Sequence, residues 1–487
     1  MSRLLFIMVS MSQSFYWYDY ETWGINPKTT RPSQFAGLRT DLDFNIVGEP
    51  LVLFSKPTDD FLPEPDAVMV TGVSPQKALE EGVIEAEFAV AIQKELSSPG
   101  TISLGYNTIR FDEAFNRYLF WRNFYNPYDH SWKNSCSTWD IIDMVRLTRA
   151  LRPEGINWPE QDGKPTNRLE KLSVANGIEH QDAHDALADV YATIGLAKLI
   201  KTNQPKLFEY LLNNRDKKSV ARMLDVNNMI PIVHASDKFG SDCLSTALVV
   251  PVAPIEDGRK ILVFDLKTDP QQILDLTAEQ IAENMFTPRK NLPEGTERIG
   301  AKGIKLNASP VLAPESTLDD AAAERILLNR ARAKKHLELI KKYKAEIAEK
   351  LVKAHERDWS SSSRASSGGG FSDAESKLYD GFVLGSDTDK FDKVRAGELD
   401  ITFQDERLQD LVAHYKARNY PEQLTDEEKL EWEKYRSERL FKSKNNYETF
   451  AKRLAELAEQ HKDSPKKIEL LEDLQLYAES IYPHDHD

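Results

Sequence analysis

Strand-like and helical patterns alternate over residues 16–200, and this alternation constrains the possible folds more than any other feature of the 487-residue chain. Short aromatic and β-branched runs such as YWYDYET (16–22) and TISLGYN (101–107) are followed by longer helical patterns, for example DALADVYATIGLAKLIKT (185–202). Alternating strands and helices indicate a sheet that is covered by helices. We therefore expect an α/β domain over residues 15–203.

A different pattern follows this domain. The stretch ALVVPVAPIEDGRKILVFDLKT (247–268) contains two β-rich runs joined by an Asp-Gly pair, which is the usual signal for a β-hairpin. Residues 318–355 repeat Leu, Ile and Tyr at three- and four-residue spacing, and this spacing predicts one long amphipathic helix. We therefore expect a small β domain with a long helix over residues 204–358.

A low-complexity run separates this region from the end of the chain. The run SSSSRASSGGG (360–370) predicts a flexible linker over residues 359–371. Beyond it, several segments combine helical periodicity with helix-start signals, which predicts a C-terminal α-helical domain over residues 372–487. Residues 1–14 contain the apolar run LLFIMV, which is too short for a signal peptide, so we expect an N-terminal extension there.

Composition excludes several classes of protein. The two cysteines, Cys136 and Cys243, are far apart and lack C-x-x-C spacing, which argues against a disulfide framework or a cysteine zinc site and favours the cytoplasm. No apolar run is long enough to span a bilayer. The formal net charge of −15 argues against a polyanionic partner, but residues 325–353 contain ten Lys or Arg against three Glu.

Asp19 and Glu21 stand two residues apart in the apolar run YWYDYET. In a strand, residues i and i+2 share a face, so both carboxylates point one way while Tyr18 and Tyr20 point the other. Two ionised carboxylates there repel each other and lose hydration, so we expect a divalent cation to neutralise them. The alternative is an edge strand with both groups in water.

Further acidic residues follow along the chain. GYNTIRFDEAF (105–115) ends a strand and opens a helix near Asp112, whose carboxylate is either a helix cap or a ligand. On one helix, His184 and Asp189 would lie about 140° apart, so they can share a site only if His184 lies on the preceding loop or first turn. Three neighbours stay open as alternatives: His180, Asp182 and Asp185.

Three carboxylates with a nearby histidine on an α/β scaffold suit two-metal hydrolysis of a phosphodiester. In such chemistry two cations stabilise the charge of the displaced phosphate, and the histidine deprotonates the attacking water. Mg²⁺ suits hard oxygen ligands of this kind. The residues themselves therefore predict a magnesium-dependent hydrolase.

The set Asp19-x-Glu21, Asp112 and His184-x4-Asp189 resembles the DEDDh group of 3′–5′ exonucleases. Longer blocks are similar to the exodeoxyribonuclease I family of bacterial single-strand DNA exonucleases over nearly the full chain. These blocks include DYETWG, RPSQFAGLRTD, GYNTIRFDE, RNFYNPY, LRPEGINWPE, NGIEHQDAHDALADVYATI and LDITFQDERLQDLVAHYKARNYP. The resemblance implies a ribonuclease H-like α/β exonuclease domain with a mixed sheet, a small SH3-like β-barrel domain and a C-terminal helical domain.

The resemblance also implies a role for each matching position. Asp19, Glu21 and Asp189 would hold two Mg²⁺ ions, Asp112 would complete the carboxylate set, and His184 would be the general base. The implied reaction is 3′–5′ degradation of single-stranded DNA to 5′-mononucleotides, in DNA repair and recombination. Two alternatives stay open: a ribonuclease of the same chemistry, and a non-catalytic docking protein for single-stranded DNA.

Substrate contacts are implied in the same way. Glu21 and Arg168 match family positions that contact the substrate, and the alternative for Arg168 is an ion pair with Glu170 or Asp162. The stretch NRYLFWRNFYNPYDHSW (116–132) interleaves arginines with aromatics, a combination typical of single-strand binding, although most of its aromatics belong to the core. The family's strand path resembles this sequence at Arg117, Tyr128, Trp132, Arg146 and Arg152.

The family resemblance further implies a channel around the strand and a protein partner. The basic residues at 325–353 would line part of the channel, or would simply form a solvated helix face. Relatives bind the acidic, Phe-ended tail of single-strand DNA-binding protein, for which Arg152 and Tyr210 are the candidate contacts here. A closed channel needs no second subunit, so we expect a monomer without membrane attachment.

Overall fold

The computed structural model describes residues 13–180, 185–288, 291–365 and 387–483. Residues 1–12 of the expected N-terminal extension, residues 366–370 of the Ser/Gly run, and His184 and Asp182 lie outside the described residues. The chain forms two units, which are described separately. The first comprises residues 1–138, 181–191 and 370–487, and the second comprises residues 139–180 and 192–369.

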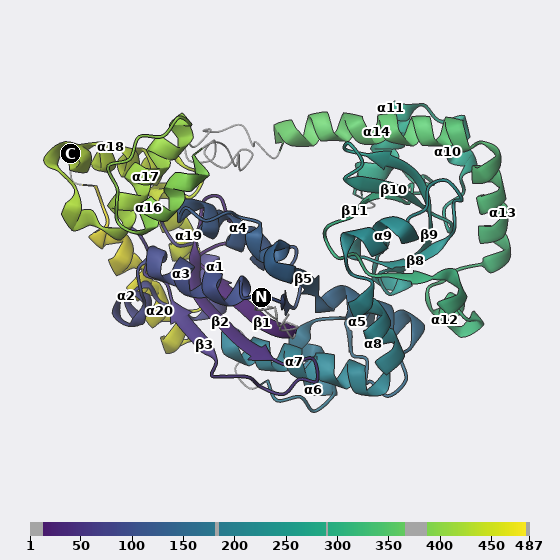
Figure 1. Cartoon of the computed structure of the whole chain (residues 1–487), viewed down its shortest axis with the longest axis horizontal. Coiled ribbons are helices and arrows are strands. Elements are labelled where there is room, and N and C mark those ends of the chain that lie inside the picture. The colour runs from purple at the N-terminus through teal and green to yellow at the C-terminus, as the bar shows by residue number, and fades with distance from the viewer. Residues whose placement is uncertain (1–12, 181–184, 289–290, 366–386, 484–487) are drawn as a thin grey trace, which may run out of the picture. The chain divides into compact units, whose positions relative to one another are not determined.

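A five-stranded mixed sheet forms the centre of the α/β domain, with the strand order β3-β2-β1-β4-β5 (Figure 1). The central strand β1 pairs with β2 in antiparallel and with β4 in parallel orientation. The sheet is therefore mixed, as the sequence predicted. Its strands are β1 (Ser14–Thr22), β2 (Pro32–Thr40), β3 (Leu51–Phe54), β4 (Thr101–Gly105) and β5 (Ser137–Asp140).

The tyrosine face of β1 forms the core beneath two helices. Tyr16, Tyr18 and Tyr20 are almost fully buried and pack against apolar side chains of α3 (Glu85–Leu96) and α4 (Asp112–Arg122). Successive side chains of a strand alternate between its faces, so this packing directs Asp19 and Glu21 to the other side of the sheet. The first turns of α7 (Ala186–Asn203) also belong to this unit.

The predicted C-terminal helical domain is present in the first unit. Helices α18 and α19 each begin with a capping box, in which Thr425 and Asn446 bond the third helical residue. Apolar residues of the last three helices pack with Trp23, Phe61 and Val68 in one core. The helices of this domain are α16 (Phe391–Arg395), α17 (Glu406–Asn419), α18 (Asp426–Lys442), α19 (Tyr447–Gln460) and α20 (Pro465–Ser480). Two short helices of the α/β domain, α1 (Pro65–Thr71) and α2 (Pro75–Glu81), contact α20.

The second unit contains an antiparallel sheet with the order β11-β10-β9-β8-β12. The predicted hairpin is confirmed, because β9 and β10 pair and residues 256–258 between them all have positive φ. Asp and Gly adopt that conformation at low cost. The strands are β8 (Ile232–Ala235), β9 (Thr246–Ile255), β10 (Lys260–Asp265), β11 (Ala301–Lys305) and β12 (Leu312–Pro314), and a separate short hairpin contains β6 (Glu160–Gln161) and β7 (Lys164–Pro165).

The prediction of one long helix over 318–355 is wrong. Three helices occupy this region, namely α12 (Asp320–Arg325), α13 (Arg330–Lys342) and α14 (Lys344–Ala365). Leu327 adopts a left-handed φ of 57°, and Asn329 then caps the N-terminus of α13. Helix α14 also continues through the serines to Ala365, so the first part of the expected linker is helical. Serine costs little inside a helix that is already nucleated.

The remaining helices of the second unit surround its two sheets. They are α5 (Ile141–Leu151), α6 (Leu169–Ala175), α8 (Pro205–Asn213), α9 (Lys217–Met223), α10 (Gln271–Asp275) and α11 (Ala278–Phe286). Short 3₁₀ turns of the whole chain include η1 (Asp129–Ser131), η2 (Lys133–Ser135), η3 (Asp237–Phe239), η4 (Ser241–Cys243), η6 (Glu315–Thr317), η7 (Thr388–Lys390) and η8 (Pro421–Gln423). Among the described residues, no helix is both long and apolar enough to cross a membrane.

Candidate active site

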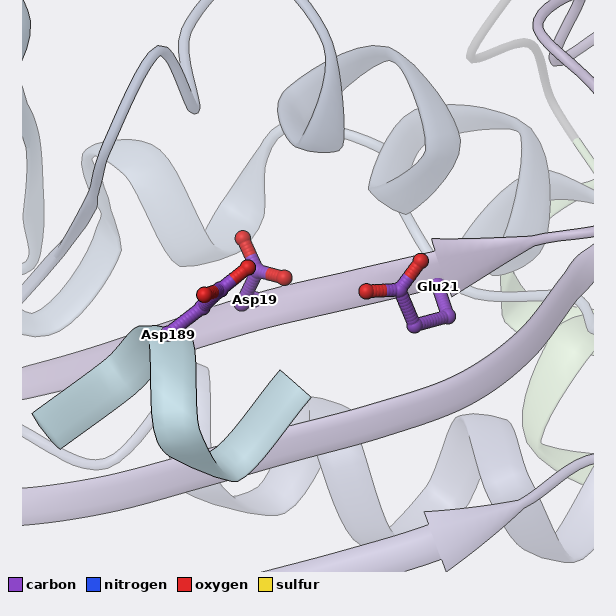
Figure 2. Close-up of side chains that lie close together, drawn as sticks. All are labelled: Asp19, Glu21 and Asp189. Atoms are coloured by element: carbon purple, nitrogen blue, oxygen red, sulfur yellow. The ribbon is translucent and has the colours of Figure 1, made fainter. Parts of the chain in front are cut away.

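Three carboxylates meet on the face of β1 opposite the tyrosines. Asp19 and Glu21 project from the strand, and Asp189 reaches them from the first turn of α7 (Figure 2). Their ligand oxygens all lie within 4.8 Å of one another, close enough to hold a metal ion together. Glu21 is buried, while Asp19 and Asp189 are partly buried. The expectation that Asp19 and Glu21 share a face with a further carboxylate is therefore confirmed.

Helix α7 begins just before Asp189. The Asp185 carboxylate accepts hydrogen bonds of 3.1 Å from the backbone N–H groups of Leu187 and Ala188, so it caps the helix. Of the three neighbours left open, Asp185 thus has a capping role, and neither it nor His180 belongs to the carboxylate group. Because α7 starts at Ala186, His184 precedes the helix, although its own position lies outside the described residues.

Asp112 joins the site from α4, where it is the first helical residue and is 3% exposed. Its Oδ1 accepts a 3.1 Å hydrogen bond from the backbone N–H of Tyr20. This amide has no partner on β4, because β1 and β4 pair only as far as Trp17 and Leu104. The Asp112 carboxylate therefore replaces a strand partner and is fixed beside Asp19, and it does not cap its own helix.

The end of β4 permits this arrangement because Gly105 lies against β1. A Cβ atom at this position would lie 2.5 Å from the Tyr18 carbonyl oxygen and 2.2 Å from Thr108 Oγ1. Real Cβ atoms essentially never come so close to backbone oxygen. A glycine therefore allows the chain to leave the sheet here and enter α4 with Asp112 directed at the site.

The electrostatic environment of these carboxylates favours the binding of a cation. Burial raises the pKa of Asp19 well above its usual range, and the charges of Asp112, Glu21 and Asp189 raise it further. Burial likewise raises the pKa of Glu21 to about 9, with additional contributions from Asp189, Asp112 and Asp185. Within the part of the chain that the structure describes, burial and other carboxylates cause both shifts, so a bound divalent ion is the natural counter-charge.

The predicted strand contacts in the first unit lie on α4 and on the loop that follows it. Arg117 lies with its guanidinium carbon 5.5 Å from the centre of the Tyr128 ring, a cation–π contact. Tyr128 is 38% exposed and Trp132 is 64% exposed, so both rings are presented at the surface of this unit. Their geometry suits the stacking of bases.

The remaining predicted contacts belong to the second unit. Arg146 is 9% exposed and bonds Asp143 at 2.5 Å on its own helix, which favours a structural role. Arg168 has an exposed side chain, and the alternative ion pair with Glu170 is present at 3.7 Å. Arg152 lies 3.4 Å from Asp319.

The candidate partner contacts also lie in the second unit, together with one arginine that the sequence analysis did not single out. Tyr210 is half-buried, and its hydroxyl lies 3.3 Å from the Met223 sulfur. Arg325 donates to the backbone carbonyl of Ala150 at 2.9 Å, directly before Leu151 and Arg152. The basic count over 325–353 contained Arg325, but nothing in the sequence related it to the end of α5.

The chain matches three family models. The model described as "Exonuclease" matches residues 16–197, the exonuclease I SH3-like domain matches residues 215–357, and the exonuclease I C-terminal domain matches residues 372–481. Together they cover the α/β domain, the antiparallel β domain and the helical domain. The fold class expected from the resemblance is therefore confirmed.

Relatives match over nearly the whole chain. Exodeoxyribonuclease I of Haemophilus influenzae is 42% identical over 95% of this chain and 98% of its own length. Exodeoxyribonuclease I of Escherichia coli is 40% identical over 96% of this chain and 98% of its own length.

Solved structures of exonuclease I are similar to this chain over nearly its whole length. E. coli exonuclease I in complex with a dA16 oligonucleotide has a TM-score of 0.90 at 39% identity, over 96% of this chain and 100% of the other. A zinc-bound form of the E. coli complex with single-stranded DNA has a TM-score of 0.88 at 39% identity. The match covers 96% of this chain and 99% of the other. A structure of SSB/exonuclease I with the inhibitor CFAM has a TM-score of 0.86 at 38% identity. The match covers 97% of this chain and 100% of the other.

Proposed function

This chain belongs to the exodeoxyribonuclease I family of DNA-hydrolysing enzymes, and we propose that it removes nucleotides from the 3′ end of single-stranded DNA as 5′-mononucleotides. The convergence of Asp19, Glu21 and Asp189 within 4.8 Å carries this proposal. Burial and neighbouring carboxylates raise the pKa of Asp19 and of Glu21, so the ion-free group is electrostatically unfavourable and a bound cation would stabilise it.

The donor set fits two Mg²⁺ ions. Carboxylate oxygens are the ligands that Mg²⁺ prefers, and Asp19, Glu21 and Asp189 would hold the pair. When bound, the ions supply Lewis-acid stabilisation of the negative charge that develops on the scissile phosphate. His184 would accept the proton of the attacking water, and Asp112 would keep β1 and α4 together beside it.

Single-stranded DNA is the proposed substrate. The exposed rings of Tyr128 and Trp132 would stack bases, and Arg117 and Arg168 would contact phosphates. Glu21 would also contact the terminal nucleotide. Arg152 is a further candidate, while Arg146 would first have to release Asp143. We assign the enzyme to DNA repair and recombination in the cytoplasm, as a monomer.

The acidic tail of single-strand DNA-binding protein is the proposed protein partner. Arg152 and Arg325 both lie at the end of α5, where two guanidinium groups could receive the tail's carboxylates. Tyr210 would supply an aromatic contact for the terminal Phe. The relative crystallised as SSB/exonuclease I supports such a contact.

Digestion of a 5′-labelled single-stranded DNA oligomer with Mg²⁺ tests the function. We expect a ladder that shortens from the 3′ end, and a loss of several orders of magnitude in Asp19→Ala and His184→Ala. Asp257→Asn, which removes an exposed carboxylate from the β9–β10 turn, is the matched control and should digest like wild type.

Parallel lanes with RNA and duplex DNA separate the alternatives. Equal degradation of RNA would point to a ribonuclease. Tight DNA binding without any product, in wild type as well as in the variants, would instead indicate a docking protein and would overturn the proposed chemistry.

A further inference from the structure

A buried, hydrogen-bonded pair of side chains lies directly beside the active site without belonging to its carboxylate group. Glu113 follows Asp112 on α4 and is 2% exposed. It faces the tyrosine side of β1, where the Tyr18 hydroxyl donates a 2.8 Å hydrogen bond to its Oε1. The Asn116 amide adds a bond of 3.4 Å to the same oxygen. Glu113 is thus fixed to the strand that carries Asp19 and Glu21.

His130 is the partner of Glu113. It lies in η1, is 1% exposed, and its Nε2 is 3.0 Å from Glu113 Oε2. Burial alone would raise the pKa of Glu113, but His130, Arg117 and the Tyr18 hydroxyl together lower it to about 2. An ionised carboxylate only accepts hydrogen bonds, so Nε2 of His130 is the donor in this contact. The ring also packs edge-on against Phe120 of α4, with centroids 5.3 Å apart.

The segment around His130 carries the two exposed aromatic side chains of this region. We refer to residues 128–132 as the aromatic loop. Tyr128 begins it and Trp132 ends it, and both rings are exposed while His130 between them is buried. Arg117 packs on Tyr128 and lies 3.9 Å from Glu113, so this carboxylate supports the loop at two points.

We propose that Glu113 and His130 act as a positioning pair that holds the aromatic loop in the orientation needed to bind single-stranded DNA. The proposal rests on the proposed function, because it assumes that Tyr128 and Trp132 stack bases. A buried charge loses so much hydration that apolar residues of equal size often stabilise a fold as well or better. Stability alone is therefore a weak reason for burying the Glu113 carboxylate here, whereas a fixed geometry is a specific one.

His130→Ala tests the pair by comparing two substrates. A DNA oligomer reaches the aromatic loop, whereas the p-nitrophenyl ester of thymidine 5′-monophosphate offers only the scissile phosphate and one base. A stacked base contributes about 1–3 kcal/mol, so we expect KM for the oligomer to rise roughly 5- to 150-fold. We expect kcat/KM for the ester to stay unchanged, because the carboxylate group is not altered.

Two variants are compared with His130→Ala. His130→Gln retains a donor near the position of Nε2 and should recover most of the lost oligomer affinity. Lys133→Ala is the matched control, since it removes the exposed Lys133–Asp129 pair from the same segment and should leave both substrates unaffected. If His130→Ala does not fold cooperatively, Glu113→Gln carries the same comparison.

A double-mutant cycle with Trp132→Ala identifies the route of the effect. If the pair acts through the loop, the increase in KM of the double variant will be smaller than the two single-variant increases combined, because both changes remove the same base contact. Equal losses on oligomer and ester, full additivity, or a fall in melting temperature without a change in KM would each overturn the proposal. Failure of wild type to digest the oligomer would instead overturn the proposed function.

Discussion

The carboxylate of Asp60 accepts a 2.8 Å hydrogen bond from Nη2 of Arg418, although 358 residues separate them along the chain. Asp60 is fully buried, and Arg439 donates to the same oxygen at 2.5 Å while Arg31 lies 3.7 Å away. Arg31 directly precedes β2, the partner of β1, whereas Arg418 and Arg439 belong to α17 and α18. One carboxylate therefore joins the C-terminal helices to the sheet that carries the active site.

Asp60→Ala should destabilise the protein severely. Removing one partner of a buried ion pair costs about 3–5 kcal/mol, because the remaining charges stay buried without compensation. Here three guanidinium groups would lose their common acceptor. We expect a large fall in the urea midpoint of unfolding, measured by circular dichroism.

Asp66→Ala is the matched control for this experiment. Asp66 bonds Arg453 of α19 at 2.6 Å and so joins the same two parts of the chain, but its side chain is 61% exposed. Exposed ion pairs contribute roughly 0–1 kcal/mol. A midpoint that falls equally in both variants would show that burial of Asp60 is not what matters.

Divalent cations should stabilise the folded enzyme. Burial and neighbouring carboxylates raise the pKa of Asp19 and of Glu21, so the ion-free fold must either protonate these groups or hold repelling charges, and a bound ion removes that cost. Ligand at about 100 times its dissociation constant adds roughly 2.7 kcal/mol. Thermal melting in Mg²⁺ and in EDTA measures the effect.

Glu21→Gln should largely abolish this dependence. The variant has one carboxylate fewer in the group, so we expect it to melt higher than wild type in EDTA and to gain little from Mg²⁺. Its nuclease activity should fall by several orders of magnitude. An equal Mg²⁺-induced shift in wild type and variant would contradict cation binding at this group.

The parts of the site that sequence could predict are those with local signals. Alternation along β1 predicts that Asp19 and Glu21 share a face, because the strand period is visible in seven residues. The contact of Asp189 with them depends on how α7 crosses the sheet, and only the family resemblance indicated it. The pairing of Glu113 with His130 likewise requires a loop to fold back on α4.

The wrong prediction of one helix over residues 318–355 has a physical cause. The apolar spacing of Leu337, Ile340, Tyr343, Ile347 and Leu351 continues from α13 into α14 although the helix ends at Lys342, and the left-handed Leu327 separates α12 from α13. Spacing reports which residues face the core and does not report whether the helix is continuous. Arg146 and Asp143 are three residues apart on one helix, so their ion pair is a local contact that side-chain spacing also allows.

Arg168→Ala separates the two roles considered for this side chain. Arg168 precedes α6 with an exposed guanidinium, and its ion pair with Glu170 spans 3.7 Å, so loss of that pair should change the melting temperature very little. A phosphate contact would appear as an increase in KM for the DNA oligomer. Glu170→Ala removes the same ion pair and should leave KM unchanged. An equal effect of both variants on KM would support the structural role alone.

Asp265→Asn should stabilise the β domain in a pH-dependent manner. Burial raises the pKa of Asp265 at the end of β10 to about 6, against the lowering effects of the Lys267 backbone N–H and the Lys267 charge. An acid whose pKa is higher in the folded state than in the unfolded state destabilises the fold when it is ionised.

The sign and size of the effect follow from that shift. Stability should fall as pH rises from about 4 through 6 and then level off, because the folded protein must ionise a group that prefers to be neutral. A shift of roughly two pKa units corresponds to about 3 kcal/mol. Asn keeps an acceptor for the Lys267 N–H without the charge, so its advantage over wild type should be greatest near about pH 8 and shrink as pH falls. Calorimetry at several pH values measures it, with Asp257→Asn as the exposed control that should show no such trend.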